Sequence, residues 1–223
     1  EYNSVIVKIY SDSLGFPRLE DDTCYDQTYA GKLASHPELD IHLRGRGGFI
    51  ASQLQSMVTM DARYSRGNID ELAILHFGIV DCAPRPIPRA LRFLLSRLDE
   101  SIRSRFVRVI HVVRPYSQRL IFFRFTTPKR FRVIYNDLVQ GQLQKNIKVI
   151  CISIMGPSNE AEHHSPGLRK SVKEYNNLIK NVCSLHGATY IEVSDDESFL
   201  LRDGIHLSNK GHEEIYRLLM GNI

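Results

Sequence analysis

Five short runs rich in valine and isoleucine constrain the fold of this chain more than any other feature of its sequence. Apolar runs of this length with many β-branched residues are typical of strands that are buried on both faces of a sheet. The runs span residues 5–10, 39–43, 72–77, 148–154 and 189–193. We therefore predict a sheet of buried strands at the centre of the molecule.

The segments between these runs have apolar residues at helical spacing. They span residues 25–35, 50–60, 88–103, 167–186 and 208–220. Alternation of buried strands with amphipathic helices is typical of a parallel sheet that helices cover on both faces. The pattern predicts an α/β fold, a three-layer α/β/α sandwich with a mainly parallel sheet.

Length and composition indicate one globular domain over residues 1–223. The chain has 43% hydrophobic and 24% charged residues, which is ordinary for a globular protein. No apolar run is long enough to cross a bilayer. The first residues lack the basic region and small-residue cleavage site of a secretory signal, so we expect a cytoplasmic protein.

A serine-rich turn, Ser11-Asp12-Ser13-Leu14-Gly15, follows the first predicted strand. Ligands of open α/β sheets bind beyond the carboxyl ends of the strands, so a hydroxyl group here is placed for chemistry. A serine after a strand is also typical of a helix cap. Taken alone, the turn leaves both readings open, with Ser11 and Ser13 as possible nucleophiles.

Near the other end, Asp203-Gly204-Ile205-His206 precedes the last predicted helix. A serine hydroxyl needs an imidazole to take its proton, and a carboxylate can orient that imidazole. Three-residue spacing in a loop can place Asp203 beside His206. The same tetrapeptide alone is more typical of a surface turn, so the two segments indicate catalysis only in combination.

Together these segments resemble the SGNH, or GDSL-like, hydrolases, which carry a serine block after the first strand and a D-x-x-H block before the last helix. The resemblance covers nearly the whole chain and implies a flavodoxin-like sheet. It implies Ser13 as nucleophile, His206 as general base and Asp203 as its orienting carboxylate, with Ser11 as a minor alternative to Ser13. It implies no metal and no organic cofactor.

The resemblance also implies an oxyanion hole. The family's second block corresponds to Arg44-Gly45-Arg46-Gly47-Gly48-Phe49, and we assign the Gly48 N–H, with Gly47 as the close alternative, to act beside the N–H of Ser13. The third block usually reads G-x-N-D, but this chain has Val80 in place of the asparagine. A valine side chain donates no hydrogen bond, and loss of one oxyanion donor typically costs ~10²–10³ in turnover.

Four further residues are candidates for substrate binding: Asp12, Arg46, Asp81 and Arg85. Either arginine could replace the missing oxyanion donor, whereas Asp81 could do so only if it were protonated. Asp81 could instead cap the next turn, and Arg85 could merely solvate a loop. The pair His163-His164 lies in a polar loop without a second ligand group at characteristic spacing, which favours a solvated loop over a metal site.

Basic residues concentrate in one stretch, residues 85–132, which has 13 basic and two acidic residues within a chain of net charge +4. This stretch reads as an elaboration of the domain between the third and fourth blocks. It is either a solvated face or a surface for an anionic partner, such as an acidic glycan, a lipid-linked phosphate or a membrane face that the protein contacts peripherally. Nucleic acid is not favoured, because no nucleic-acid-binding module accompanies the charge.

Three functions remain open from the sequence. The first is a serine esterase that removes an acyl group, in particular O-acetyl. The resemblance to bacterial SGNH proteins implies a carbohydrate or lipid-linked glycan as its substrate, as in bacterial surface polysaccharide metabolism. The second is an O-acyltransferase that uses the same triad. The third is a degenerate SGNH domain that binds glycan or a protein partner without turnover, which Val80 favours and the intact Ser13, Asp203 and His206 set disfavours.

Overall fold

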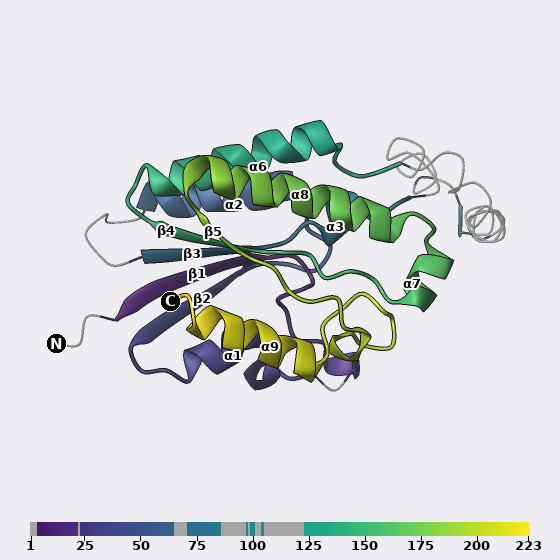
Figure 1. Ribbon diagram of the computed structural model, residues 1–223, viewed down its shortest axis with the longest axis horizontal. Coiled ribbons are helices and arrows are strands. Elements are labelled where there is room, and N and C mark those ends of the chain that lie inside the picture. Colours follow the sequence, from purple (N-terminus) through teal and green to yellow (C-terminus); the bar gives the residue numbers. More distant parts are fainter. Residues whose placement is uncertain are drawn as a thin grey trace.

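The computed structural model describes residues 4–21, 23–64, 71–85, 97, 99–100, 104 and 123–223. A five-stranded parallel sheet with strand order β2-β1-β3-β4-β5 lies at its centre (Figure 1). The strands are β1 (Val5–Ser11), β2 (Leu39–Gly45), β3 (Glu71–His76), β4 (Lys148–Ile152) and β5 (Thr189–Ile191).

Helices cover both faces of the sheet, which confirms the predicted three-layer α/β/α sandwich. One layer contains α1 (Tyr29–Ala34) and α9 (Asn209–Met220), and the other contains α2 (Ala51–Tyr64), α6 (Pro128–Leu143) and α8 (Leu168–His186) (Figure 1). Within the described part of the chain, no helix is both long and apolar enough to cross a membrane.

Short helices lie in the loops between these elements. The α-helical turns are α3 (Ile79–Cys82) and α7 (Asn159–His164), and the 3₁₀ turns are η1 (Leu19–Asp21), η2 (Tyr25–Gln27) and η3 (Glu197–Phe199). The predicted helix at 25–35 is divided into η2 and α1. Thr28 causes the division, because its Oγ1 accepts a hydrogen bond from Gly31 N–H at 3.1 Å and thereby begins α1 as its cap.

The side chains of β3 show why the strands read as continuous apolar runs. Leu72 and Ile74 pack into the core on the α1/α9 side, whereas Ala73 and Leu75 pack into the core on the opposite side. Successive side chains of a strand point to opposite faces, so a strand covered on both sides buries all of them. Each of the five predicted runs overlaps a strand of the structure for this reason.

Helix α6 is the main element that the sequence analysis missed. Its first turn falls in the basic stretch that we interpreted as an elaboration, and the predicted helix at 88–103 lies almost wholly outside the described residues. Thr127 accepts a hydrogen bond from Arg130 N–H at 3.4 Å, and Pro128 occupies the first helical position. Phe131 and the residues that follow it at helical spacing are buried against the sheet.

Phe131 is the centre of the contact between α6, α8 and the sheet. Its fully buried ring lies 4.7 Å from the ring of Tyr175 in α8 and 5.3 Å from that of Tyr135, measured between centroids. The Phe77 ring, just after β3, lies 6.3 Å away at an angle of 66°. Aromatic pairs with such geometry stabilise a core beyond the area that they bury.

Replacing Phe131 with alanine should therefore lower the free energy of unfolding by about 3–5 kcal/mol, because the cavity left behind can collapse only partly. Urea denaturation would measure the loss. Val133 lies on the same helix with 54% of its surface exposed, and its replacement with alanine should cost less than about 1 kcal/mol. Equal losses for the two variants would contradict this account of the core.

Candidate active site

The proposed triad residues come together at the carboxyl edge of the sheet. The turn that follows β1 carries Ser13, and the loop that precedes α9 carries Asp203 and His206. The Nε2 atom of His206 lies 2.9 Å from the Oγ of Ser13, across a separation of 193 residues in the chain. The Nδ1 atom of the same ring lies 2.5 Å from Oδ2 of Asp203.

The surroundings of Asp203 keep it ionised. Burial raises the pKa of this carboxyl group, but the hydrogen bonds from the His206 ring and from the N–H groups of His206 and Ile205 outweigh burial. The pKa of Asp203 therefore lies well below its usual value. An ionised Asp203 favours the tautomer with a proton on Nδ1, so that Nε2 is free to accept the proton of Ser13.

The loop that holds Asp203 and His206 is fixed to the segment after β4. Ser158 N–H donates to the carbonyl of Gly204 at 2.9 Å. Gly204 has a φ of +68°, and an added Cβ would lie 1.9 Å from Ser158 Oγ. Only glycine fits this contact, which holds the histidine loop against its neighbour.

Asp12 holds the Ser13 turn in place from beneath. Its carboxylate is fully buried, with Oδ2 accepting from Gly78 N–H at 2.9 Å and Oδ1 accepting from Leu14 N–H at 3.1 Å. Burial raises the pKa of Asp12 to about 6, and the two hydrogen bonds oppose that rise. The carboxylate accepts from backbone N–H groups and does not line the cavity at Ser13, so the geometry gives Asp12 a structural role and does not support its assignment to substrate binding.

Asp81 has a similar structural position. It is buried, its oxygens accept from Ala51 N–H at 2.9 and 3.1 Å, and Thr126 Oγ1 also donates to it. Burial raises the pKa of Asp81 to about 7. Its carboxylate thus satisfies the N-terminus of α2, and Asp81 does not line the cavity at Ser13, so the geometry does not support its assignment to substrate binding either.

Ser11, the alternative nucleophile, is fully buried, and its Oγ donates to the carbonyl of His76 at 2.6 Å. It is the last residue of β1 and points into the core. Its hydroxyl cannot reach a substrate without unfolding of the strand end. The structure therefore leaves Ser13 as the serine of this turn that lines the cavity.

A cavity of about 660 Å³ opens at Ser13 and His206. Gly47 and Gly48 line it near Ser13, and Gly48 has a φ of +82°, which favours glycine. The remaining wall is mostly apolar and includes the position where the family has its asparagine. Its apolar residues are Ile79, Val80, Ala83, Pro84, Phe125, Leu168 and Ile205.

Arginines flank Ser13 from two directions. Arg85 lines the 660 Å³ cavity, with its guanidinium 4.7 Å above the ring of Phe125. Arg46 lines a second cavity of about 340 Å³ on the other side of Ser13. Arg18, which the sequence analysis missed although it closely follows the serine turn, lines both cavities and pairs with Asp21 at 2.8 Å.

Most of the basic stretch, including Arg119, lies outside the described residues. Arg124 pairs with Glu174 at 2.8 Å with only 12% of its side chain exposed, so it serves the packing of α8. Arg130 and Arg132 are exposed on α6. Among the described residues, no three metal-ligating side chains gather closely enough to hold an ion, and the His164 side chain in α7 is 70% exposed.

Two buried histidines lie behind the nucleophile turn. The Nδ1 atom of His76 lies 3.0 Å from the hydroxyl of Tyr29, and Tyr29 N–H donates to Nδ1 of His212 at 3.4 Å. Burial lowers the pKa of His76 to about 3 and that of His212 to about 4. Both rings are therefore neutral at physiological pH and act as packed hydrogen-bonding groups.

Comparisons with known proteins agree with this geometry. The model of the GDSL-like Lipase/Acylhydrolase family matches residues 12–214. The fold is similar to that of a lipase/acylhydrolase from Enterococcus faecalis, with 18% identity, a TM-score of 0.64, and 99% of this chain and 95% of the other covered. No curated protein matches the sequence.

Two carbohydrate esterases also have this fold. A carbohydrate acetylesterase from Sinorhizobium meliloti has 16% identity and a TM-score of 0.61, with 97% of this chain and 96% of the other covered. An acetyl xylan esterase has 16% identity and a TM-score of 0.60, with 98% and 99% covered. Identities this low establish the shared fold and not a shared substrate.

Because His76 is buried, we expect its protonation to lower the free energy of unfolding in acid. Its folded pKa of about 3 lies below the unfolded value near 6.5, so the unfolded chain binds more protons and stability falls as the pH drops below about 7. Between pH 7 and pH 5 this one ring accounts for about 2 kcal/mol of that fall. In the His76→Gln variant, the loss of unfolding free energy over this interval should be smaller by the same amount.

Urea denaturation at several pH values would measure the difference. His212, Asp12 and Asp81 contribute to the pH dependence of both proteins, so their effects cancel in the comparison. Val133→Ala, which removes no titratable group, offers a control and should keep the wild-type slope. An unchanged slope in His76→Gln would show that His76 is already protonated, or solvated, in the folded protein.

Proposed function

The chain belongs to the GDSL-like lipase/acylhydrolase family, and on that basis we propose that it is a serine esterase that removes an acyl group, in particular O-acetyl, from a carbohydrate. One observation carries the proposal. Asp203, His206 and Ser13 form a continuous series of hydrogen-bonding contacts that ends in a cavity of about 660 Å³. A cavity of this size can hold an acyl group together with part of a sugar.

In the proposed reaction, Ser13 Oγ attacks the ester carbonyl carbon while Nε2 of His206 takes the hydroxyl proton. The tetrahedral intermediate collapses, the bond to the sugar oxygen breaks, and His206 returns the proton to that oxygen. Water then attacks the acyl-enzyme with His206 again as base, and the carboxylic acid leaves with Ser13 regenerated. Asp203 stabilises the imidazolium at each stage.

The N–H groups of Ser13 and Gly48 are the proposed donors to the oxyanion. Val80 lines the same cavity but supplies no donor. Of the two arginines that we considered as replacements, Arg85 shares the cavity with Val80, whereas Arg46 lies in the neighbouring one. Arg85 is therefore the better placed of the two to assist the oxyanion.

The apolar wall of the cavity supports an acyl group as the part of the substrate that it contacts. The similarity of fold to two carbohydrate acetylesterases supports a sugar as the alcohol. If a sugar hydroxyl reaches the acyl-enzyme in place of water, the same residues perform an O-acyl transfer. A lipid-linked glycan could then serve as the acceptor, so product analysis must look for both outcomes.

Replacing Ser13 with alanine should reduce turnover of p-nitrophenyl acetate and of acetylated xylo-oligosaccharides at least ~10³-fold, because no other group can form the acyl-enzyme. Release of p-nitrophenol and of acetate would measure the loss. Ser11→Ala provides the control from the same turn and should keep most of the activity, since Ser11 lies outside the cavity. Retained activity in a folded Ser13→Ala protein would refute the mechanism, and an inactive wild type would favour the binding-only alternative.

Replacing Val80 with asparagine should raise esterase turnover by about 10- to 100-fold, because it restores a donor at the family's third oxyanion position. Steady-state kinetics with p-nitrophenyl acetate would measure the gain. Val80→Ala changes the same position without adding a donor and should give no increase. Unchanged or lower turnover in a folded Val80→Asn protein would mean that another group already fills this role.

A further inference from the structure

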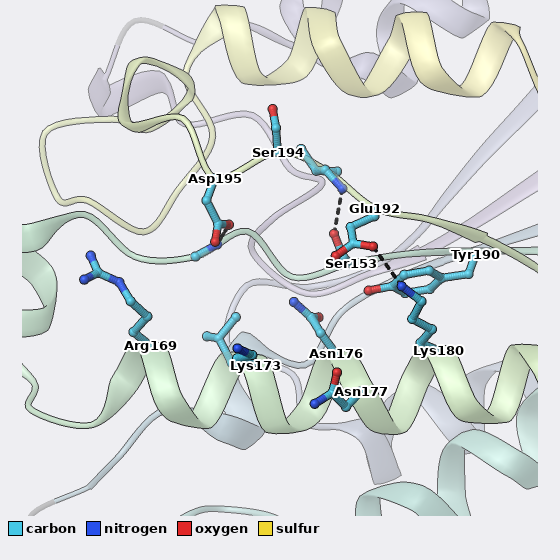
Figure 2. Close-up of a pocket in the computed structure, with 13 residues that line it drawn as sticks. Ser153, Arg169, Lys173, Asn176, Asn177, Lys180, Tyr190, Glu192, Ser194 and Asp195 are labelled. Carbon is cyan, nitrogen blue, oxygen red and sulfur yellow. Dashed lines mark hydrogen bonds and ion pairs between the residues drawn. The ribbon is translucent and has the colours of Figure 1, made fainter.

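A second groove runs along α8, on the side facing the segment that follows β5 (Figure 2). Its volume is about 630 Å³, and none of its lining residues lines the cavity at Ser13. Helix α8 forms one wall, and the loops at the carboxyl ends of β4 and β5 form the other. The catalytic reaction proposed above makes no use of this groove.

Hydrogen bonds within the walls fix the shape of the groove. The Asn176 carboxamide accepts from Ile154 N–H at 2.8 Å and donates to Ile154 O at 2.7 Å. Asp195 Oδ1 accepts from Gly156 N–H at 2.8 Å, and a Cβ added to Gly156 would lie 2.7–2.8 Å from the Asp195 carboxylate atoms. The two loops thus approach each other through contacts that tolerate no larger residue, and the groove is formed in advance of any ligand.

Arg169, Lys173 and Asn177 line the groove at intervals of one helical turn, so they form a row about 12 Å long on α8. Arg169 Nη2 donates to Pro157 O at 3.0 Å, which directs the guanidinium along the wall. In the part of the chain that the structure describes, the Lys173 ammonium and the Asn177 side chain make no hydrogen bond or ion pair. These two groups are free to contact a ligand.

The charges in the groove favour one kind of ligand. The groove has three cationic side chains and two carboxylates, which belong to Arg169, Lys173, Lys180, Glu192 and Asp195. Lys180 already pairs with Glu192 at 3.0 Å. Arg169 and Lys173 therefore remain opposite Asp195, which uses one oxygen for Gly156 N–H. A ligand carboxylate suits the two cations, and ligand hydroxyl groups suit Asp195 and Asn177. A phosphate-dense surface such as a membrane would meet repulsion from Asp195.

Two consecutive residues of α8 line the cavity at Ser13 and the groove. Arg169 follows Leu168, whose side chain lines the cavity at Ser13. The Arg169 guanidinium also donates to Pro157 O, and the N–H of the next residue, Ser158, donates to Gly204 O. Gly204 lies between Asp203 and His206 in the sequence. We propose that this groove binds an acidic carbohydrate chain, with a uronate carboxylate at Arg169 and Lys173. This inference rests on the proposed function, since it supplies the subsite for the sugar chain whose ester is cleaved at Ser13.

Calorimetric titration of the Ser13→Ala protein with tetragalacturonate would test the proposal, with neutral galactotetraose as the uncharged match. The acidic tetramer should bind and the neutral one should bind more weakly. Lys173→Gln should weaken binding of the acidic tetramer about fivefold, the upper range for an exposed ion pair, and Arg169→Gln with Lys173→Gln more than about tenfold. Raising the salt from 50 to 500 mM should weaken it further.

Lys170→Gln is the matched control, because it removes the same charge from the same helix at an exposed position that does not line the groove. Its affinity should stay within about twofold of the parent. Equal loss in Lys170→Gln, equal affinity for the neutral tetramer, or no binding of either tetramer would overturn the proposal. Stronger binding to vesicles of phosphatidylglycerol than to the tetramer would also overturn it, in favour of a membrane surface.

A kinetic measurement separates this proposal from the esterase proposal. Lys170→Gln in the active protein should hydrolyse p-nitrophenyl acetate at the wild-type rate, because Lys170 lines neither the groove nor the cavity at Ser13. If the wild type hydrolyses this ester but Ser13→Ala binds no tetramer, only the groove assignment fails. If the tetramer binds as expected but the wild type hydrolyses no ester, only the esterase proposal fails.

Discussion

The buried carboxylate of Asp12 is the interaction on which the geometry of the site depends. It accepts hydrogen bonds from Leu14 in the nucleophile turn and from Gly78 after β3, so one side chain joins two loops that adjacent strands bring to the same edge. An unpaired buried charge would be strongly unfavourable, and these two N–H groups offset that cost. Moving either loop would remove one of these two hydrogen bonds from a buried carboxylate, which explains how a short surface turn can hold Ser13 in one orientation.

Much of this arrangement could be predicted from the sequence, and the exceptions share a physical cause. The strands were predictable because both of their faces are buried. The segments of the site were recognised by their resemblance to the blocks of the family, because each of them alone is also typical of a helix cap or a surface turn. The direction of a carboxylate after a strand was not predictable. Asp12 and Asp81 follow strand ends as substrate-binding residues do, but both turn inward to backbone N–H groups that belong to distant segments. Helix α6 was missed because the charges of its exposed face obscured the apolar stripe around Phe131.

The apolar side chain of Val80 affects the electrostatics of the cavity as well as its hydrogen bonds. Val80 is 8% exposed and continues an apolar wall with Ile79 and Leu168. Loss of the family's asparagine removes a donor, yet an apolar patch also holds less water than a polar one would. Hydrogen bonds to an oxyanion are stronger where the local dielectric is lower. The apolar patch would therefore strengthen the hydrogen bonds of the proposed donors, the N–H groups of Ser13 and Gly48, and so offset part of the loss of the asparagine.

The number of basic residues in a segment does not show which of them are available to a ligand. That depends on what each arginine or lysine side chain already contacts. Arg124 belongs to the basic stretch but is paired with Glu174, and Arg18 at the cavity is paired with Asp21. Lys173 lies outside the basic stretch of residues 85–132, yet it lines a preformed groove together with the carboxylate of Asp195. A cation that is already paired gains little from a second anion. Lys173, which makes no ion pair among the described residues, is therefore better suited to bind a ligand carboxylate than Arg124. Selectivity for an acidic sugar chain then depends on the pairing of α8 with the loop after β5, a tertiary contact that links residues far apart in the sequence.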